Sequence, residues 1–390
     1  MNKADSENQD FSIVLGGPFF QLLRKAHLTG NALELIKKRI IIISLIAWLP
    51  LCILSIISGQ AVGERVNLPF IEDIEVHIRF LVAMPLMVGA ELLVHQRMRL
   101  VVNQFQERNL IPEPALSQFR NAFTSAFRLR NSIVAEVFIL VIIYVIGYKV
   151  VWQQSMAIDT TAWYSEPTVG KSNLSLAGVW FRYVSLPLFQ FLFLRWYYRI
   201  FIWSRFLFQV SRIRMKLVPT HPDQLGGLGF LSNTLFAFMP LAMAHGVVLS
   251  GMIANHIFHD GAALLDFKIE AIIFILVILF VVILPLFFFS SQLSETKRVG
   301  CIDYGKFASR YTQAFDDQKN TRDPLSDSQA LQGLADLVNS YRVVEKMQII
   351  PISRNDIVML AVVTIAPVLP LVLTMMPLSE LIKILSGVLF

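Results

Sequence analysis

Seven long apolar runs alternate with short polar segments along this chain and restrict it to one class of fold. They occupy residues 40–58, 78–95, 133–152, 176–196, 234–258, 269–289 and 357–376. An α-helix rises about 1.5 Å per residue, so about 20 apolar residues cross a hydrocarbon core of about 30 Å. Charged residues make up only 16% of the chain, whereas a soluble protein carries about 25%. We therefore predict an all-α integral membrane protein with about seven transmembrane helices.

Basic residues collect in alternate loops between these runs. Lys and Arg are frequent before the first run and after the second, fourth and sixth, and they are sparse in 59–77 and 153–175. Because basic loops remain in the cytoplasm, this pattern predicts a cytoplasmic N-terminus and a C-terminus on the outer side. The net charge of +6 arises beside apolar helices, which indicates contact with the lipid bilayer and its anionic headgroups and not with nucleic acid.

The runs and loops divide the chain into four parts. We predict a cytoplasmic amphipathic N-terminal arm (1–39), a six-helix transmembrane bundle (40–290), a cytoplasmic helical segment (291–355), and a seventh transmembrane helix with a short amphipathic tail (356–390). Cytoplasmic loops of the bundle are expected at 97–131 and 205–233. The polar stretch 315–327 is expected to be mobile.

Two helices are expected outside the membrane. Residues 116–127 place their Phe side chains on one face, which suits a helix on the inner leaflet or against the bundle. The cytoplasmic segment carries an apolar seam that could pair with another helix or with a second protomer. Its members are Leu331, Leu334, Val338 and Tyr341. The seam favours a homo-oligomer.

The fourth run continues as a helical pattern to about Lys216, interrupted only by Pro187. Such a helix would be about 60 Å long and would extend into the cytosol. Its inner half mixes arginines with aromatic residues and includes Arg195 and Arg199. These two arginines are interpreted either as interfacial anchors whose charged ends reach the headgroups, or as the lining of a basic pore or an anion site.

Several titratable residues lie near membrane depth, where a charged residue costs about 2.5–3.5 kcal/mol on insertion scales. Topology places five of them at one inner depth: Glu91, His95, Glu136, His221 and Asp223. These residue types bind divalent metals or relay protons. Arginines at the same level could instead neutralise the glutamates in a structural ion-pair network. Those arginines are Arg97, Arg99, Arg128 and Arg130.

Residues 219–230 read Pro-Thr-His-Pro-Asp-Gln-Leu-Gly-Gly-Leu-Gly-Phe and separate two apolar runs. The prolines are expected to end the fourth helix, and Asp223 could cap the next turn or orient His221. Three glycines allow the backbone to approach another helix or a ligand closely. They are Gly226, Gly227 and Gly229. An anion could rest at the N-terminus of the helix that follows.

His245 lies in the middle of the fifth run, beside small residues at four-residue spacing. These residues are Ala242, Gly246, Ser250 and Ala254. A ladder of small residues lets another helix pack closely. We therefore interpret His245 as a hydrogen-bonding residue between helices, with a functional role as the alternative.

Four segments of the chain resemble a group of bacterial multi-pass membrane proteins. They are Gly16-Gly17-Pro18, Trp48-Leu49-Pro50-Leu51, the stretch from His77 to Glu91, and the string PTHPDxxGGLGF at 219–230. The resemblance covers most of the chain. It implies a bacterial cytoplasmic (inner) membrane protein, and it supplies no activity, substrate or catalytic residue.

The sequence favours a channel or transporter for a small ion or solute, with the inner polar residues as a gate or binding site. A membrane-embedded enzyme, metal-dependent or lipid-modifying, is the first alternative, and a non-catalytic scaffold or signalling protein is the second. We predict no cofactor. A divalent metal held by the inner carboxylates and histidines belongs to the enzyme alternative.

Overall fold

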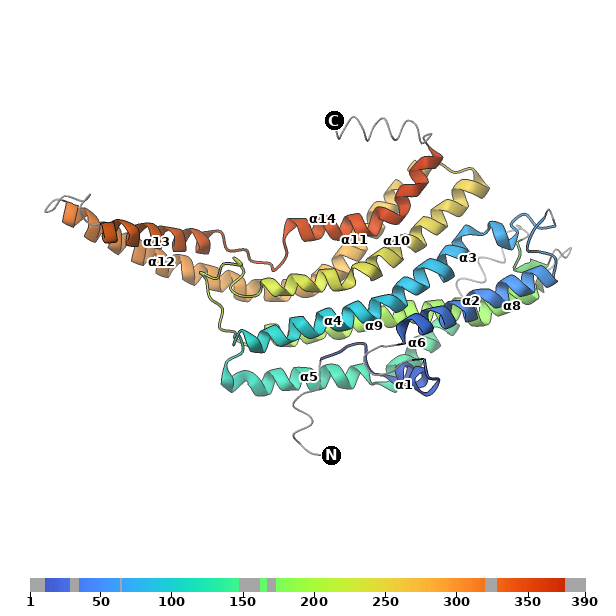
Figure 1. Cartoon of the computed structure of the whole chain (residues 1–390), viewed down its shortest axis with the longest axis horizontal. Coiled ribbons are helices and arrows are strands. Elements are labelled where there is room, and N and C mark those ends of the chain that lie inside the picture. Colours follow the sequence, from blue (N-terminus) through green and yellow to red (C-terminus); the bar gives the residue numbers. More distant parts are fainter. Residues whose placement is uncertain are drawn as a thin grey trace.

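The computed structural model describes residues 11–28, 35–63, 65–146, 162–166, 173–319 and 328–375. Its helices lie side by side in an elongated bundle, from which α12 and α13 project at one end (Figure 1). Within the described residues, the strands are limited to one antiparallel pair, β1 (Ser165–Glu166) and β2 (Asn173–Leu174). The predicted all-α fold is confirmed.

The helices differ widely in length. In chain order they are α1 (Pro18–Lys25), α2 (Ile36–Ile57), α3 (Ile74–Ile78), α4 (Met84–Glu107), α5 (Leu116–Arg130), α6 (Ile133–Ile146), α8 (Leu176–Trp180), α9 (Leu186–Ser211), α10 (Asn233–Asp260), α11 (Lys268–Ile283), α12 (Ser290–Lys319), α13 (Ser328–Glu345) and α14 (Arg354–Ile365). Short π-helical turns join α3 to α4 and α8 to α9 without a break, and a 3₁₀ turn joins α11 to α12.

Six helical segments are long and apolar enough to cross a membrane. They are Ile36–Ile57, Ile74–Glu107, Leu176–Ser211, Gly229–Asp260, Leu264–Ala314 and Arg354–Thr374. They confirm a multi-pass membrane protein. A seventh apolar helix, α6, is shorter, and the end of the predicted third span lies outside the described residues.

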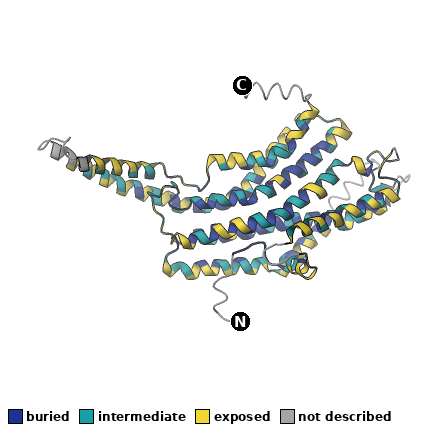
Figure 2. Cartoon of the chain, viewed as in Figure 1, coloured by how far each residue is buried: buried dark blue, intermediate teal, exposed yellow. Residues whose placement is uncertain are grey.

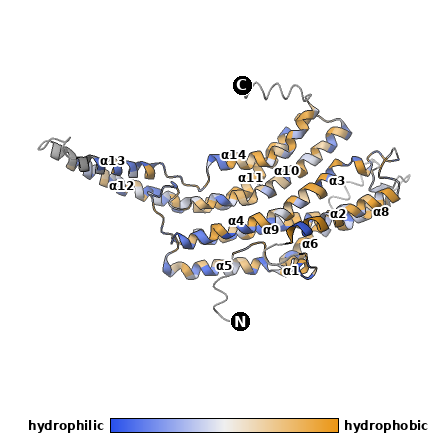
Figure 3. Cartoon of the chain, in the orientation of Figure 1, coloured by the Kyte–Doolittle hydropathy of each residue, from blue (hydrophilic) through white to orange (hydrophobic). Residues whose placement is uncertain are grey.

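Four of these segments are much longer than a bilayer requires. Gly229–Asp260 has 32 residues, Ile74–Glu107 has 34, Leu176–Ser211 has 36 and Leu264–Ala314 has 51. At about 1.5 Å per residue the longest spans about 77 Å, against a hydrocarbon core of about 30 Å. In Figure 3 the hydrophobic colour dominates α11 and most of α14, whereas α12 and α13 are largely hydrophilic. The long helices therefore carry one end of the bundle out of the membrane.

One predicted boundary needs correction, and one helix is longer than the span predicted within it. The helix of the second predicted span (78–95) continues to Glu107, into the expected loop 97–131, which also contains the predicted helix α5. The fourth helix was expected to reach about Lys216 and to end at the prolines, but it ends at Ser211. Gln292 of α12 explains this early end, because its Nε2 donates to the carbonyl oxygens of Ser211 and Ile213 at 2.5 and 2.7 Å.

The two predicted extramembrane helices both form. α5 packs against α9 and buries Phe119 and Ala126, so it lies against the bundle. α13 pairs with α12 of the same chain, where Tyr341 lies beside Gly305. Part of the stretch expected to be mobile, 315–319, belongs to α12, and 320–327 lie outside the described residues.

α10 occupies the centre of the bundle and packs against α3, α4 and α14 (Figure 2). Through the predicted ladder of small residues, α10 contacts the last membrane segment. A Cβ added to Gly246 would lie 1.8 Å from the carbonyl oxygen of Thr364, and Ser250 Oγ donates to the carbonyl oxygen of Pro367 at 2.7 Å. The ladder therefore brings two helices into backbone contact, as predicted.

Candidate functional site

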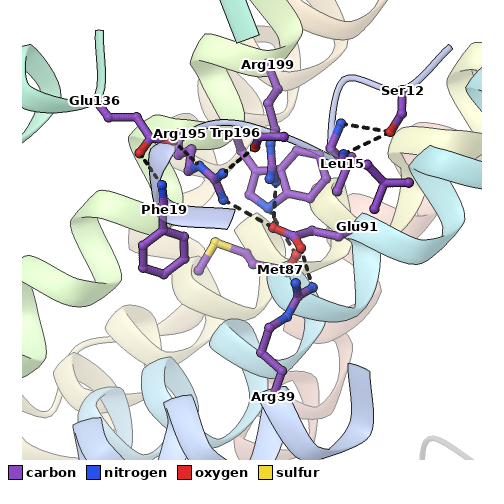
Figure 4. A network of polar contacts seen from close by, with 12 residues as sticks. Ser12, Leu15, Phe19, Arg39, Met87, Glu91, Glu136, Arg195, Trp196 and Arg199 are labelled. Carbon is purple, nitrogen blue, oxygen red and sulfur yellow. Dashed lines mark hydrogen bonds and ion pairs between the residues drawn. The ribbon is translucent and has the colours of Figure 1, made fainter. Parts of the chain in front are cut away.

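Five ionisable side chains from four helices meet inside the bundle (Figure 4). They are Arg39, Glu91, Glu136, Arg195 and Arg199, and each is at most 7% exposed. We call this set the charge cluster. Arg39 and Glu136 lie in the first turns of α2 and α6, whereas Glu91, Arg195 and Arg199 lie midway along longer helices. The charge cluster therefore lies at the membrane edge where α2 and α6 begin.

Glu91 is the centre of the charge cluster. Its Oε2 accepts a hydrogen bond from Nη2 of Arg39, and its Oε1 accepts one from Nη1 of Arg199 at 2.8 Å. Nη1 of Arg195 lies 3.6 Å from the same Oε1. One carboxylate thus faces three guanidinium groups.

Glu136 pairs with the same face of α9. Its Oε1 accepts from Nε of Arg195 at 3.1 Å, and its Oε2 accepts from the backbone N–H of Phe19 at 2.7 Å. Arg195 also lies over the Phe19 ring, with 5.0 Å from its guanidinium carbon to the ring centroid. The second glutamate therefore ties α6, α9 and the N-terminal region together.

The charge cluster has more positive charge than its two carboxylates balance. Three arginines and two glutamates carry a formal surplus of one positive charge. In addition, Nη1 of Arg39 and Nη2 of Arg199 are buried without a hydrogen-bond partner in the described part of the chain. A buried unsatisfied donor costs about 1–3 kcal/mol, and more when it is charged. The arginines therefore offer hydrogen bonds that no described residue accepts.

A non-helical N-terminal segment covers the charge cluster. We call residues 11–17 the strap; its first four side chains are at most 2% exposed. Phe11 packs among Phe123, Phe127, Trp203 and Phe206, with ring centroids 4.7–5.8 Å away. The strap is thus held by an aromatic pocket between α5 and α9.

Polar contacts fix the strap over the charge cluster. The carbonyl oxygen of Gly16 accepts from Arg195 at 3.4 Å, and that of Ser12 accepts from Arg130 at 2.7 Å. Ser12 Oγ lies 3.0 Å from Nδ1 of His95. Gly17 has a φ of 89°, and a Cβ there would lie 2.9 Å from the carbonyl oxygen of Arg130, so this turn requires glycine.

The structure brings together four of the residues that the sequence singled out. Glu91, Glu136, Arg195 and Arg199 share the charge cluster, and His95 contacts the strap one helical turn from Glu91. Because Arg195 and Arg199 are buried and ion-paired, they do not act as interfacial anchors. The arginines that neutralise Glu91 and Glu136 also differ from the four expected ones, since Arg39, Arg195 and Arg199 make these pairs.

The turn at 219–230 lies elsewhere. Asp223 contacts Arg108, which follows α4, with 3.8 Å between Oδ2 and Nη1. Arg108 is 17 residues beyond Glu91 on a continuous helix, which corresponds to about 25 Å. His221 and Asp223 are therefore not at the depth of the charge cluster, contrary to the arrangement that the topology predicted.

Asp223 organises this turn through the backbone. Its Oδ1 accepts from the N–H groups of Leu225 and Gly227 at 2.8 and 3.1 Å, and its Oδ2 accepts from that of Gly229 at 2.9 Å. Nδ1 of His221 lies 2.8 Å from Oδ1. Burial raises the pKa of Asp223, but these hydrogen bonds outweigh it and hold the pKa below its ordinary value.

The turn also joins distant parts of the chain. Arg108 donates to the carbonyl oxygen of Gly227 at 3.0 Å, and the N–H of Gln348 donates to that of Gln224 at 2.8 Å. Gly226 has a φ of 63°, and a Cβ there would lie 3.1 Å from Cε of Met347. Through these contacts the turn connects the end of α4 and the start of α10 with the segment before α14.

This geometry predicts an acid-dependent loss of stability. Because the folded-state pKa of Asp223 is depressed, its stabilising contribution is full above the unfolded pKa of about 3.9 and is lost as pH falls through the folded pKa. Asp223→Asn should remove about 1–3 kcal/mol near neutral pH and flatten this acid limb. Unfolding midpoints in detergent at decreasing pH measure both effects. Asp303→Asn, at an exposed position of α12, is the control and should keep the acid limb unchanged.

His245 joins α9 to α10. Its Nδ1 lies 2.7 Å from the carbonyl oxygen of Leu241, which can only accept, so Nδ1 carries the proton. Its Nε2 then accepts from the hydroxyl of Tyr197 at 2.9 Å. Both ring nitrogens are satisfied between helices, in agreement with the interpretation from the sequence.

Metal ligands do not assemble at either location. Within the described residues, no group of three or more His, Cys, Asp and Glu side chains is placed to hold a metal ion. The expected metal set is divided between the charge cluster and the turn, which are about 25 Å apart along α4. At the charge cluster the two carboxylates face arginines, which are cations and do not bind metals.

Comparison with known proteins adds no assignment, since no family model, curated protein or solved structure matches this chain. The bacterial inner membrane as its location, and the membership that the sequence resemblance implies, stay predictions. What the protein does must be argued from its own geometry.

Proposed function

We propose that this membrane protein passes a small monovalent anion, such as chloride, across the bilayer, and that the arginines of the charge cluster bind it. The observation that carries the proposal is the surplus of one positive charge together with two unused guanidinium nitrogens, on Arg39 and Arg199. One monovalent anion would neutralise the surplus and accept hydrogen bonds from arginine.

The position of the charge cluster supports the same function. It lies at the membrane edge among apolar helices, where an uncompensated charge is expensive and marks an ion pathway more often than a surface contact. The strap closes the cluster on the side of α5.

Flux through liposomes tests the proposal. The purified protein should release chloride from loaded liposomes faster than empty liposomes do. Arg199→Gln leaves two arginines and two glutamates, a balanced set that should fold, and it removes the surplus charge. We expect chloride flux to fall about tenfold or more, the loss that one charge-assisted hydrogen bond gives.

Two controls make the result specific. Arg199→Lys keeps the charge and should retain more flux than Arg199→Gln. Arg298→Gln removes the same charge from an exposed position of α12, where Arg298 pairs only with Glu295 in the described residues, and should leave flux unchanged. The proposal is wrong if the protein releases no more chloride than empty liposomes, or if folded Arg199→Gln matches the wild type.

A further inference from the structure

A cavity lined by two basic residues lies on the opposite side of the bundle from the strap (Figure 1). This cavity of about 450 Å³ opens between α12, the segment before α14, and the start of α14. Its lining includes Lys297, Arg354, Met347, Ile349, Ile350 and Ile352. The cavity has the volume of a small-ligand site.

The cavity lies at the edge of the membrane. Arg354 is the first residue of the last apolar segment, Arg354–Thr374. Lys297 follows the apolar part of its helix, eight residues after Phe289. Both cations therefore lie where a membrane segment meets the extramembrane region, which is the level of lipid headgroups.

The two cations of the cavity have no partner in the part of the chain that the structure describes. Neither Lys297 nor Arg354 makes a hydrogen bond or an ion pair with another described residue. The neighbouring acids are engaged elsewhere, because Asp356 caps α14 through Ser353 and Glu295 pairs with Arg298. Among the described residues, the lining of the cavity contains no acidic side chain. The cavity is therefore free to accept an anion.

Gln348 and several apolar side chains make the rest of the wall. Ile349 is 46% exposed beside the cations, and Ile350 and Ile352 continue the surface. A free phosphate gains nothing from this apolar lining, whereas a phospholipid has a charged headgroup next to apolar glycerol and acyl parts. The combination of two cations and an apolar wall at headgroup level matches an anionic phospholipid.

We propose that this cavity binds an anionic phospholipid, with its phosphate between Lys297 and Arg354 and its apolar part against Ile349 and Ile350. The sequence indicates contact with anionic headgroups in general, and this proposal assigns one such contact to the cavity. The site is independent of anion passage through the charge cluster. The bound lipid would join α12 to α14 and hold the last membrane segment against the extramembrane part of α12.

Native mass spectrometry of the full chain in detergent tests this site with added phosphatidylglycerol or phosphatidylcholine. The wild type should retain phosphatidylglycerol in preference to phosphatidylcholine. Each basic residue near a membrane surface contributes enough that losing two should weaken binding about 30-fold. We therefore expect the double variant Lys297→Gln with Arg354→Gln to lose the bound lipid.

A matched variant controls for total charge. Arg298→Gln with Arg310→Gln removes two cations from exposed positions of the same helix and should keep the lipid. The site is refuted if the Lys297 and Arg354 variant binds phosphatidylglycerol as the wild type does, or if phosphatidylcholine binds equally well. Displacement of the lipid by millimolar inorganic phosphate would also refute it, since that result identifies a site for a free anion.

Discussion

Replacing Glu91 by glutamine is expected to lower the free energy of unfolding by about 3–5 kcal/mol, the cost of leaving a buried charge without its partner. Within the described residues, Glu91 is the one carboxylate that contacts Arg39 and Arg199. Glutamine keeps the size of the side chain but removes its charge, so two guanidinium groups would remain buried without an anion. Chemical or thermal unfolding of the purified protein in detergent measures the loss.

The control for this prediction removes a glutamate of another kind. Glu295 pairs with Arg298 on the surface of α12, where both side chains are more than half exposed. Glu295→Gln should leave the unfolding midpoint unchanged, because exposed pairs are solvated and screened by salt. An equal, small effect of the two substitutions would contradict the view that Glu91 holds the charge cluster together.

A double variant distinguishes the stability that comes from the ion pair between Arg39 and Glu91 from the effect of changing either residue alone. The double variant Glu91→Gln with Arg39→Gln also removes one of the two cations that Glu91→Gln leaves buried without an anion. Its loss of stability should therefore be smaller than the sum of the losses of the two single variants. Arg199→Gln, in contrast, removes the surplus positive charge of the charge cluster. This substitution should therefore lower anion flux more than it lowers stability.

The membrane segments could be predicted from the sequence because their signal is local. Each run contains enough apolar residues to cross the bilayer, whatever its neighbours are. A close helix contact on this face of α10 was also predictable, since Gly246 and Ser250 repeat at the spacing of one helix face, but the identity of the partner helix, α14, was not. The turn around Asp223 was recognisable from its prolines and glycines, although its partners were not.

The partners of Glu91 could not be predicted, because they depend on how the helices are rotated. Lys37, Lys38 and Arg39 are consecutive, yet only Arg39 is buried and reaches Glu91. Successive residues on a helix point about 100° apart, so one of three adjacent cations faces the interior. Nothing in the local sequence says which one.

The strap was missed for a different reason. The sequence predicts one amphipathic arm over residues 1–39, but residues 11–17 are non-helical and largely buried, and α1 begins at Pro18. A bent segment that belongs to neither a helix nor a strand has no periodic signal. The apolar cluster of Phe11, Ile13 and Val14, followed at once by Gly16 and Gly17, is the one local feature that marks it.

Gly246→Ala is expected to destabilise the protein by about 3 kcal/mol or more, at the upper end of the range for overpacking. The added Cβ would lie 1.8 Å from the carbonyl oxygen of Thr364, a backbone atom that cannot move without its helix. The substitution should therefore push α14 away from α10 and break the hydrogen bond from Ser250 to Pro367. Unfolding midpoints, together with protease cleavage near the start of α14, measure the change.

Gly89→Ala is the matched control and should have the opposite sign. Gly89 also lies inside a long helix, but a Cβ there meets only Cδ1 of Ile40, at 3.8 Å. Alanine favours a helix over glycine by about 1 kcal/mol, so Gly89→Ala should be neutral or slightly stabilising. A loss at Gly246 with a gain at Gly89 shows that backbone contact, not helix propensity, requires glycine in α10. Equal effects at both positions would contradict the close packing of α10 against α14.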